Sequence, residues 1–524
     1  MKCMPGTTPP PDADASDRLS RLPAEVSVAV IGAGFAGIAM GWRLKQEGVE
    51  DFLILDRADG VGGVWRANTY PGAACDVPSH LYSFSFFLNP DWSRKFSPQS
   101  EILAYLERAA DALALRPHLR FGRTVTALVF DAEAGRWTLT FSDGAVMTAR
   151  AVVSAVGQLA EPNTPQIKDA ERFEGAMVHT AAWDPGVDFT GKRVSVIGNA
   201  ASAVQLIPEI ARTARSVTVF QRTPNWVIEK PDRAFTNVEK RLFRAAPLIH
   251  RLYRRASYLI HEARFPAFLS NSLASAYTRH RLKRQLARRI EDRGLREMLT
   301  PDYAPGCKRI LLSNDYLETL QKPHVRLIAR RPARFEPDAI LTPDGQRVAA
   351  DAVIFATGFK AVEFLASLEV RGLEGRTLKD HWAGTPRAYR GVAVSGFPNL
   401  FMLYGPNTNL GHNSIIFMLE RQAEYVARRI AKLLSEDIRV MDVTPEAEAA
   451  FNARLQKKLK KTVWAGDCPS WYKTEDGVIT NNWAGLATSF ALTLRHEDAH
   501  AWRTAPSSAE KPSAPERLGV DSPP

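Results

Sequence analysis

Three glycines and one acidic residue near the start of the chain have the types and spacing needed to bind a dinucleotide. Gly32, Gly34 and Gly37 form a G-x-G-x-x-G turn, and Asp56 follows Gly32 by 24 residues. The first glycine permits a tight turn, the second lets the backbone approach a pyrophosphate, and the third allows a helix to pack closely on a strand. The Asp56 carboxylate can accept hydrogen bonds from a ribose diol and disfavours a 2′-phosphate. The turn therefore predicts a site for FAD or NAD and not for NADP.

A second turn, later in the chain, is followed by a cation where the first is followed by an acid. It reads Gly198-Asn199-Ala200-Ala201-Ser202-Ala203, and the next strand ends before Arg222 and Thr223. Alanine at the third glycine position keeps the packing close, whereas alanine at the second moves the backbone away from the phosphates. A guanidinium suits a 2′-phosphate through paired hydrogen bonds. The second turn therefore predicts a site that prefers NADPH to NADH.

Each turn needs a strand before it and a helix after it, and the sequence supplies both. Short apolar and β-branched runs predict buried parallel strands. They are Val26–Ile31, Phe52–Leu55, Val194–Ile197 and Val217–Phe220. A helix is expected at Ile38–Glu47 after the first turn, and another, ending at Ala211, after the second. Two βαβ units predict an α/β fold with two Rossmann-like dinucleotide-binding domains.

Composition and charge exclude several other classes of protein. Of 524 residues, 45% are hydrophobic and 24% are charged, as in a globular protein that buries large cores. The net charge of +11 has no accompanying nucleic-acid-binding motif, so we expect no nucleic-acid partner. No apolar run is long enough to cross a membrane, and the N-terminus lacks the apolar core of a signal peptide. The four cysteines are far apart, which argues against a disulfide framework, a zinc site or a dithiol centre, and predicts a reducing, cytoplasmic compartment.

Further motifs make the chain resemble one family of flavoproteins. They are Gly63-Val64-Trp65, the stretch Tyr70–Asp76, the string Phe173–Trp183 with the pattern F-x-G-x-x-x-H-x-x-x-W, and Cys307-Lys308-Arg309. From Val26 to His500 the chain resembles type I Baeyer–Villiger monooxygenases, which are class B flavin-dependent monooxygenases of the flavin-containing monooxygenase superfamily. The resemblance implies FAD, NADPH and O2, and insertion of one oxygen atom next to a ketone carbonyl to give an ester or lactone. It also implies a C4a-peroxyflavin and retention of NADP+ during turnover.

The two turns and the resemblance together assign a set of residues to the cofactors. Lys308 is expected to join Arg222 at the 2′-phosphate, and Trp471 to lie on a mobile loop that closes over NADP. The full set is Gly32, Gly34, Gly37, Asp56, Gly63, Val64, Trp65, Asp76, Tyr82, Val125, Gln158, Gly198, Asn199, Ser202, Ala203, Arg222, Thr223, Lys308, Arg309 and Trp471.

Arg309 is the expected catalytic residue, and Asp76 is expected to hold it in place. In the family the corresponding arginine stands over the flavin. A fixed cation lowers the energy of an anionic peroxide and of the adduct that forms next. Arginine does this without giving up its proton, because its pKa exceeds about 12.

The string Phe173–Trp183 is expected to connect the two nucleotide domains. Its motif residues are Phe173, Gly175, His179 and Trp183. The spacing of four between His179 and Trp183 permits a helical face, and such a pair is often core packing. The resemblance implies that His179 couples domain movement and does not transfer protons to the substrate.

The resemblance further implies that the domains are discontinuous in sequence. The FAD domain is expected at 25–157 and 390–503, and the NADPH domain at 158–234 and 300–389, with disordered tails at 1–24 and 504–524. A strand at Asp351–Phe355 before an Ala-Thr-Gly-Phe turn is expected where the chain crosses between domains, and Leu400–Tyr404 predicts a strand that leads to a helix at about 413–434.

Residues 235–299 show helical spacing and predict a helical insertion in the NADPH domain. Within it, Phe243–Leu269 is both basic and apolar, which is compatible with contact to a membrane surface. The alternative is a helical cap that lines the substrate entrance.

Other functions remain open on the sequence alone. A flavin monooxygenase that oxidises nitrogen or sulfur shares the F-x-G-x-x-x-H pattern, whereas Trp183-Asp184 and Cys307-Lys308-Arg309 favour ketones. A flavin disulfide reductase needs a close cysteine pair, and a non-catalytic nucleotide-binding protein would not need Arg309 with Asp76. The expected partner is a small ketone, and the protein is expected to be a monomer or homodimer.

Overall fold

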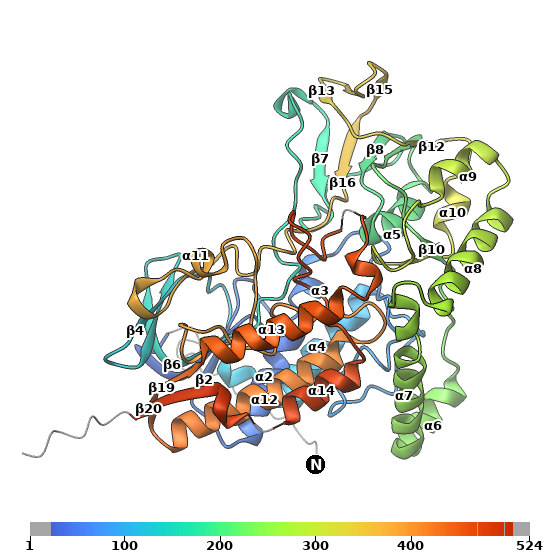
Figure 1. Cartoon of the computed structure of the whole chain (residues 1–524). Coiled ribbons are helices and arrows are strands. Elements are labelled where there is room, and N and C mark those ends of the chain that lie inside the picture. The colour runs from blue at the N-terminus through green and yellow to red at the C-terminus, as the bar shows by residue number, and fades with distance from the viewer. Residues whose placement is uncertain (1–21, 469, 497, 507–524) are drawn as a thin grey trace, which may run out of the picture.

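The computed structural model describes residues 22–468, 470–496 and 498–506, and in it two α/β units are joined by a helical insertion and by paired connections (Figure 1). The first unit is built on β1 (Glu25–Ile31), α2 (Phe35–Gln46) and β2 (Phe52–Leu55). The helix begins three residues earlier than predicted, because Gly34 is its N-cap. The β1 strand pairs in parallel with β2 and with β6 (Val146–Ser154), so the first turn lies inside the sheet and not at its edge.

The first sheet has the strand order β17-β4-β5-β6-β1-β2-β3, and β18 also pairs with β6. Its remaining strands are β3 (Leu119–Arg120), β4 (Val125–Asp131), β5 (Arg136–Phe141), β17 (Glu369–Arg371) and β18 (Leu400–Met402). Residues of α2, α4 (Gln99–Ala112), α12 (Ile415–Ser435), α13 (Pro445–Leu459) and α14 (Ala487–Arg495) share one buried apolar core.

The chain returns to the first sheet before residue 390, which is where the sequence placed the boundary. Val370 in β17 packs in the core on the other face of this sheet, together with Leu378 and Trp382 of α11 (Leu378–Trp382). A three-residue strand carries too short a pattern to be recognised in the sequence, so this return could not be located there.

The second sheet is parallel throughout, with the order β12-β9-β8-β16-β7. Its strands are β7 (Ala176–His179), β8 (Arg193–Ile197), β9 (Ser216–Phe220), β12 (Val325–Ile328) and β16 (Ala352–Phe355), with α5 (Ala201–Ile210) after the second turn. A small antiparallel sheet of β13 (Arg334–Glu336), β14 (Ala339–Leu341) and β15 (Arg347–Ala349) extends it. The prediction of two Rossmann-like units is confirmed.

The insertion is helical, as predicted, and lies along one side of the molecule (Figure 1). It contains α6 (Asn237–Ala245), α7 (Pro247–Glu262), α8 (Leu273–Arg289) and α9 (Arg293–Leu299). Its entry and exit are tied together, because β10 (Val227–Ile228) pairs with β11 (Leu311–Leu312). Its helix α7 packs on the first unit, where Arg254 donates to the carbonyl of Ser83 at 3.0 Å, whereas Leu286 of α8 and Leu299 of α9 belong to the core of the second unit.

The connections between the two sheets run side by side. Pro162 and Phe359 form an antiparallel bridge, and the amide of Asn163 donates to the carbonyl of Gly358 at 2.9 Å. The amide of Lys360 likewise donates to the carbonyl of Glu161 at 3.0 Å. The outgoing and returning segments therefore form one ribbon.

The predicted tails are partly ordered. β20 (Trp502–Pro506) pairs with β19 (Ile438–Val443), so Thr504, where the sequence placed the start of the C-terminal tail, belongs to a strand. Residues 1–21 and 507–524 lie outside the described residues.

Candidate active site

One cavity of about 1870 Å³ lies between the two units and the insertion. The first turn lines it with Gly32 and Gly34, the second with Gly198, and Arg309 reaches it from the segment before β11. Two predicted dinucleotide sites and the predicted catalytic cation therefore share a single space.

Two of the three glycines in the first turn have no room for a side chain, whereas the third has room for one. A Cβ on Gly32, whose φ is +113°, would overlap the carbonyl of Ala155, and a Cβ on Gly37 would overlap the carbonyl of Gly32. A Cβ on Gly34 would meet nothing closer than 3.5 Å. The protein itself does not require a glycine there, so close approach of a ligand to the backbone accounts for it. The N-terminus of α2 also has no side-chain cap, which leaves amide groups for a phosphate.

Asp56 stands beside this turn. Its Oδ2 accepts from the amide of Ala33 at 2.6 Å, and its Oδ1 accepts from the amide of Ala58 at 2.8 Å. These bonds fix the carboxylate at the wall of the cavity, where it can receive a ribose hydroxyl. The arrangement fits an adenine dinucleotide whose ribose carries no phosphate.

The second turn lies next to two cations. The Lys308 Nζ donates to the Thr223 Oγ1 at 2.6 Å, and burial, followed by the positive charge of Arg222, lowers the pKa of Lys308 to about 8. Two neighbouring cations that repel each other are suited to an anionic group between them. Ser202 and Asn199 line the same part of the cavity. The residues present therefore fit the 2′-phosphate of NADPH.

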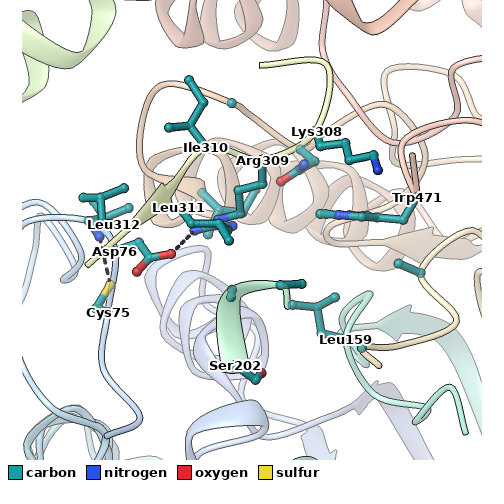
Figure 2. Close-up of a pocket in the computed structure, with 18 of the residues that line it drawn as sticks. Cys75, Asp76, Leu159, Ser202, Lys308, Arg309, Ile310, Leu311, Leu312 and Trp471 are labelled. Carbon is teal, nitrogen blue, oxygen red and sulfur yellow. Dashed lines mark hydrogen bonds and ion pairs between the residues drawn. The ribbon is translucent and has the colours of Figure 1, made fainter. Parts of the chain in front are cut away.

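Arg309 and Asp76 form an ion pair at the centre of the cavity (Figure 2). The Arg309 Nη2 lies 3.2 Å from the Asp76 Oδ2. The carboxylate side chain is 10% exposed and the guanidinium 42%, so Asp76 is held in the wall while Arg309 faces the space. Burial lowers the pKa of the Arg309 guanidinium, but Asp76, together with Tyr472, Tyr404 and Cys75, more than offsets burial, so the pKa is raised. The predicted pair is thus brought together, with a fixed cation directed into the cavity.

Gln205 is a site residue that sequence reasoning missed. Its Nε2 donates to the Ala74 carbonyl at 2.9 Å and to the Asp76 Oδ1 at 3.4 Å, and its Oε1 accepts from the Tyr70 hydroxyl at 2.9 Å. Gln205 belongs to α5 of the second unit, whereas Asp76 belongs to the first. It follows Ser202 by three residues and therefore shares a helical face with it, which was a usable signal.

Most of the predicted cofactor residues line the cavity, but three do not, and one of them is Gly37, which packs against the Gly32 carbonyl behind the turn. Trp65 donates through its Nε1 to the Tyr82 hydroxyl at 3.2 Å, and Gln158 lies nearby. Val125 packs instead in the core of the first sheet, and Ala203 packs under the second. Their side chains point away because of their positions on β4 and α5. The lining residues from the predicted set are Gly32, Gly34, Asp56, Gly63, Val64, Trp65, Asp76, Tyr82, Gln158, Gly198, Asn199, Ser202, Arg222, Thr223, Lys308, Arg309 and Trp471.

The string Phe173–Trp183 lies outside the cavity and supports the connection between sheets. His179 ends β7, so it is on a strand and not on a helical face. Its Nδ1 accepts from the amide of Ala181 at 3.0 Å, which leaves the proton of the neutral ring on Nε2, 3.3 Å from the Thr357 Oγ1. The Thr357 hydroxyl in turn donates to the Asn163 carbonyl at 2.6 Å. His179 is thereby attached to both segments of the ribbon.

The other motif residues of this string have packing roles. Phe173 packs against Phe335 with ring centroids 5.5 Å apart, and a Cβ on Gly175 would overlap the Asp351 carbonyl. Trp183 packs against Phe189 at 5.5 Å. The motif therefore holds the edge of the second sheet together.

The sequence argument against disulfides is wrong for one pair. Cys307 and Cys468 are 161 residues apart and form a disulfide, with 6.3 Å between their Cα atoms. Spacing along the chain says nothing about such a pair, and the argument for a reducing compartment loses its basis. Both cysteines are buried, and neither lines the cavity. The bond joins the segment of Lys308 and Arg309 to the segment of Trp471.

Trp471 forms part of the cavity wall near Lys308. Figure 2 shows it on the same side of Arg309 as Lys308, with Asp76 on the other side. Its carbonyl accepts from the Asn481 Nδ2 at 2.8 Å, and its ring packs against Tyr472 at 4.5 Å. Its side chain also lines the cavity on the side of Lys308, where it can cover a ligand that Lys308 holds.

Comparison with known proteins gives a consistent result. Residues 25–370 match the model of the family described as flavin-binding monooxygenase-like. The chain is 42% identical over 501 residues to a protein of Streptomyces coelicolor named Baeyer-Villiger monooxygenase, covering 95% of this chain and 96% of that protein. It is 40% identical to a protein of the same name from Pseudomonas aeruginosa, covering 91% and 90% of the two chains.

Two solved structures are similar over their whole length. A steroid monooxygenase bound to NADP superposes with a TM-score of 0.81 at 33% identity, covering 90% of this chain and 97% of that one. A closed cyclohexanone monooxygenase superposes with a TM-score of 0.84 at 28% identity, covering 93% and 100%.

Proposed function

The chain belongs to the flavin-binding monooxygenase-like family, and from this we propose that it is an FAD- and NADPH-dependent Baeyer–Villiger monooxygenase. It uses O2 to insert one oxygen atom next to the carbonyl of a ketone, which gives an ester or a lactone. The observation that carries this proposal is the cation Arg309, fixed by Asp76 in a cavity that both dinucleotide turns share. Relatives and neighbours named for Baeyer–Villiger, steroid and cyclohexanone oxidation support it.

FAD is assigned to the first unit and NADPH to the second. Gly34 and the free N-terminus of α2 would hold the FAD pyrophosphate, with Asp56 at the ribose. Arg222 and Lys308 would hold the 2′-phosphate of NADPH. Bound FAD, once reduced by NADPH, supplies the activation of O2 that the protein's own side chains cannot provide.

Arg309 supplies electrostatic stabilisation. Its guanidinium can donate hydrogen bonds to an oxygen that gains negative charge while the ketone is attacked. Because its pKa is raised further by Asp76, it keeps its proton throughout. Asp76 keeps the guanidinium oriented, and Gln205 links that orientation to the second unit. His179 is proposed to act at the ribbon between the sheets and not on the substrate.

A flavin disulfide reductase would need a cysteine pair next to the flavin. The Cys307–Cys468 pair is buried outside the cavity wall, so it does not meet that need. Oxidation of nitrogen or sulfur is the second candidate, because the description of the matching family, flavin-binding monooxygenase-like, specifies no substrate. We propose a small ketone as the partner and a monomer or homodimer as the working form.

The test measures the two half-reactions separately. The purified protein is mixed with NADPH under argon to follow flavin bleaching, and then with ¹⁸O2 and a panel of linear, cyclic, aromatic and steroidal ketones, with a sulfide as control. We expect labelled ester or lactone from at least one ketone. Arg309→Ala should bleach at a normal rate and form no ester, and Asp76→Asn should lose most of the yield. Sulfoxide without any ester would support the second candidate, and normal ester yield from Arg309→Ala would refute the role of Arg309.

A further inference from the structure

The outward face of the insertion carries a row of leucines in solvent. Leu248, Leu252 and Leu259 of α7 are four and seven residues apart, which places them on one side of the helix. They are 68%, 54% and 55% exposed. The opposite side, with His250 and His261, faces the protein. A soluble helix ordinarily turns its leucines inward, so this inverted pattern marks an interaction surface.

We propose that this surface docks on the headgroup layer of an anionic lipid bilayer. The docking face is made of exposed apolar residues on the two helices that lie at the edge of the molecule in Figure 1. It consists of Val238 and Leu242 of α6 and Leu248, Ile249, Leu252, Leu259 and Ile260 of α7.

The charge of the docking face favours an anionic lipid surface over a second copy of this chain. Arg251 and Arg255 lie among the leucines of α7 and Arg241 is exposed on α6, whereas Arg244 of α6 is ion-paired with Asp91. A second copy of the chain would bring these cations against one another, which is unfavourable. An anionic membrane places phosphates at the cations and acyl chains at the leucines, as amphipathic interfacial helices require. Within the described residues no helix is long and apolar enough to cross a bilayer.

The docking face is continuous with the mouth of the cavity. Ile260 is 59% exposed and also lines the cavity, and Tyr277 of α8 does the same at 66% exposure. The inner side of α7 contributes Tyr253 and Ser257 to the cavity wall. A docked molecule would therefore open its cavity toward the bilayer. If the proposed ketone oxidation holds, on which this step alone rests, the enzyme takes lipophilic ketones directly from the membrane.

The test is flotation of the full-length holoenzyme with lipid vesicles. One set is phosphatidylcholine with about one third phosphatidylglycerol, and the other is phosphatidylcholine alone. We expect the protein to float with the anionic vesicles and to be released when salt is raised to about 0.5 M, where screening is strong. No binding to anionic vesicles at low salt would overturn the proposal, whatever the outcome of the activity assays.

Variants then test the face itself. Leu248→Glu, Leu252→Glu and Leu259→Glu combined should lower vesicle partitioning by more than about a hundredfold, because three apolar side chains lose their burial. Arg251→Gln with Arg255→Gln should lower it about thirtyfold, as two contributions of about 1 kcal/mol predict. The matched control combines Val129→Glu, Val146→Glu and Met177→Glu, which are also exposed but lie on β4, β6 and β7.

The outcomes separate lipid from protein as the occupant. The control variant should float like the wild type, with unchanged melting temperature and flavin content in all variants. Equal flotation of the leucine variant and the control would refute the proposal. So would sedimentation velocity data showing that the wild type self-associates through this face and ignores vesicles.

Discussion

Lys308 is expected to make the preference for NADPH depend on pH. Its pKa is lowered to about 8, first by burial and then by the positive charge of Arg222. An ordinary lysine keeps its charge to about pH 10, whereas Lys308 loses its charge as the pH rises through 8. The 2′-phosphate is fully ionised over this range, because its second pKa is about 6. Affinity for NADPH should therefore fall above pH 8, while affinity for NADH should not follow it.

The size of the effect follows from the titration. With a pKa of about 8, Lys308 of the free enzyme is about 91% charged at pH 7 and about 9% charged at pH 9. If only the charged form binds the phosphate well, the ratio of kcat/KM for NADPH to that for NADH should fall about tenfold between these two pH values. In Arg222→Ala the repulsion is removed, so the midpoint should move to higher pH while the ratio at pH 7 also drops.

The assay measures the oxidation of NADPH and of NADH in the presence of a ketone from pH 6.5 to 9.5. Titrating groups that affect both cofactors alike cancel in the ratio of the two kcat/KM values. Lys308→Arg is the matched control, because arginine stays charged throughout and should give a flat ratio. A ratio that stays flat in the wild-type enzyme would refute the reasoning, and so would a fall that Lys308→Arg does not remove.

Two more perturbations follow from the geometry. Gly34→Ala should leave the free energy of unfolding within about 1 kcal/mol of the wild type, because a Cβ has room there and the φ of −82° suits alanine, yet this variant should retain FAD less well. Gly37→Ala should destabilise the fold by about 1–3 kcal/mol, because its Cβ would overlap the Gly32 carbonyl. Equal melting temperatures of the two apoproteins would contradict this difference. Cys307→Ser, Cys468→Ser and the double variant should lower thermal stability equally, by about 2–5 kcal/mol, because each removes the same cross-link; an additive loss in the double variant would show that the cysteines act separately.

The sequence predicted the parts of the fold that local chemistry determines. The strand at Phe52–Leu55 is found where it was expected, because a buried parallel strand needs only its own apolar run. The local geometry of the first turn calls for glycine at positions 32 and 37 and for a carboxylate at Asp56, so these residues could be recognised from the sequence. Arg309 and Asp76, which are 233 residues apart, were paired only through the resemblance to a family.

What the sequence could not predict depends on long-range geometry. The Cys307–Cys468 bond joins segments whose distance no spacing encodes, and the pairing of β17 rests on three residues. Val125 was placed at the cavity, but the alternation of side chains along β4 turns it into the core. The exposed leucines of α7 were visible only as an apolar and basic stretch, and the direction of each face required the packed structure.

The Cys307–Cys468 bond also limits how far Trp471 can move. Trp471 follows Cys468 by three residues, and an extended chain covers at most about 3.6 Å per residue, so its Cα stays within about 11 Å of the Cα of Cys468. Cys468 is itself pinned to the residue that precedes Lys308. The disulfide therefore tethers Trp471 at short range to the segment that contains Lys308. As long as the bond is intact, no opening of the protein can carry this indole far from the site of the nicotinamide cofactor.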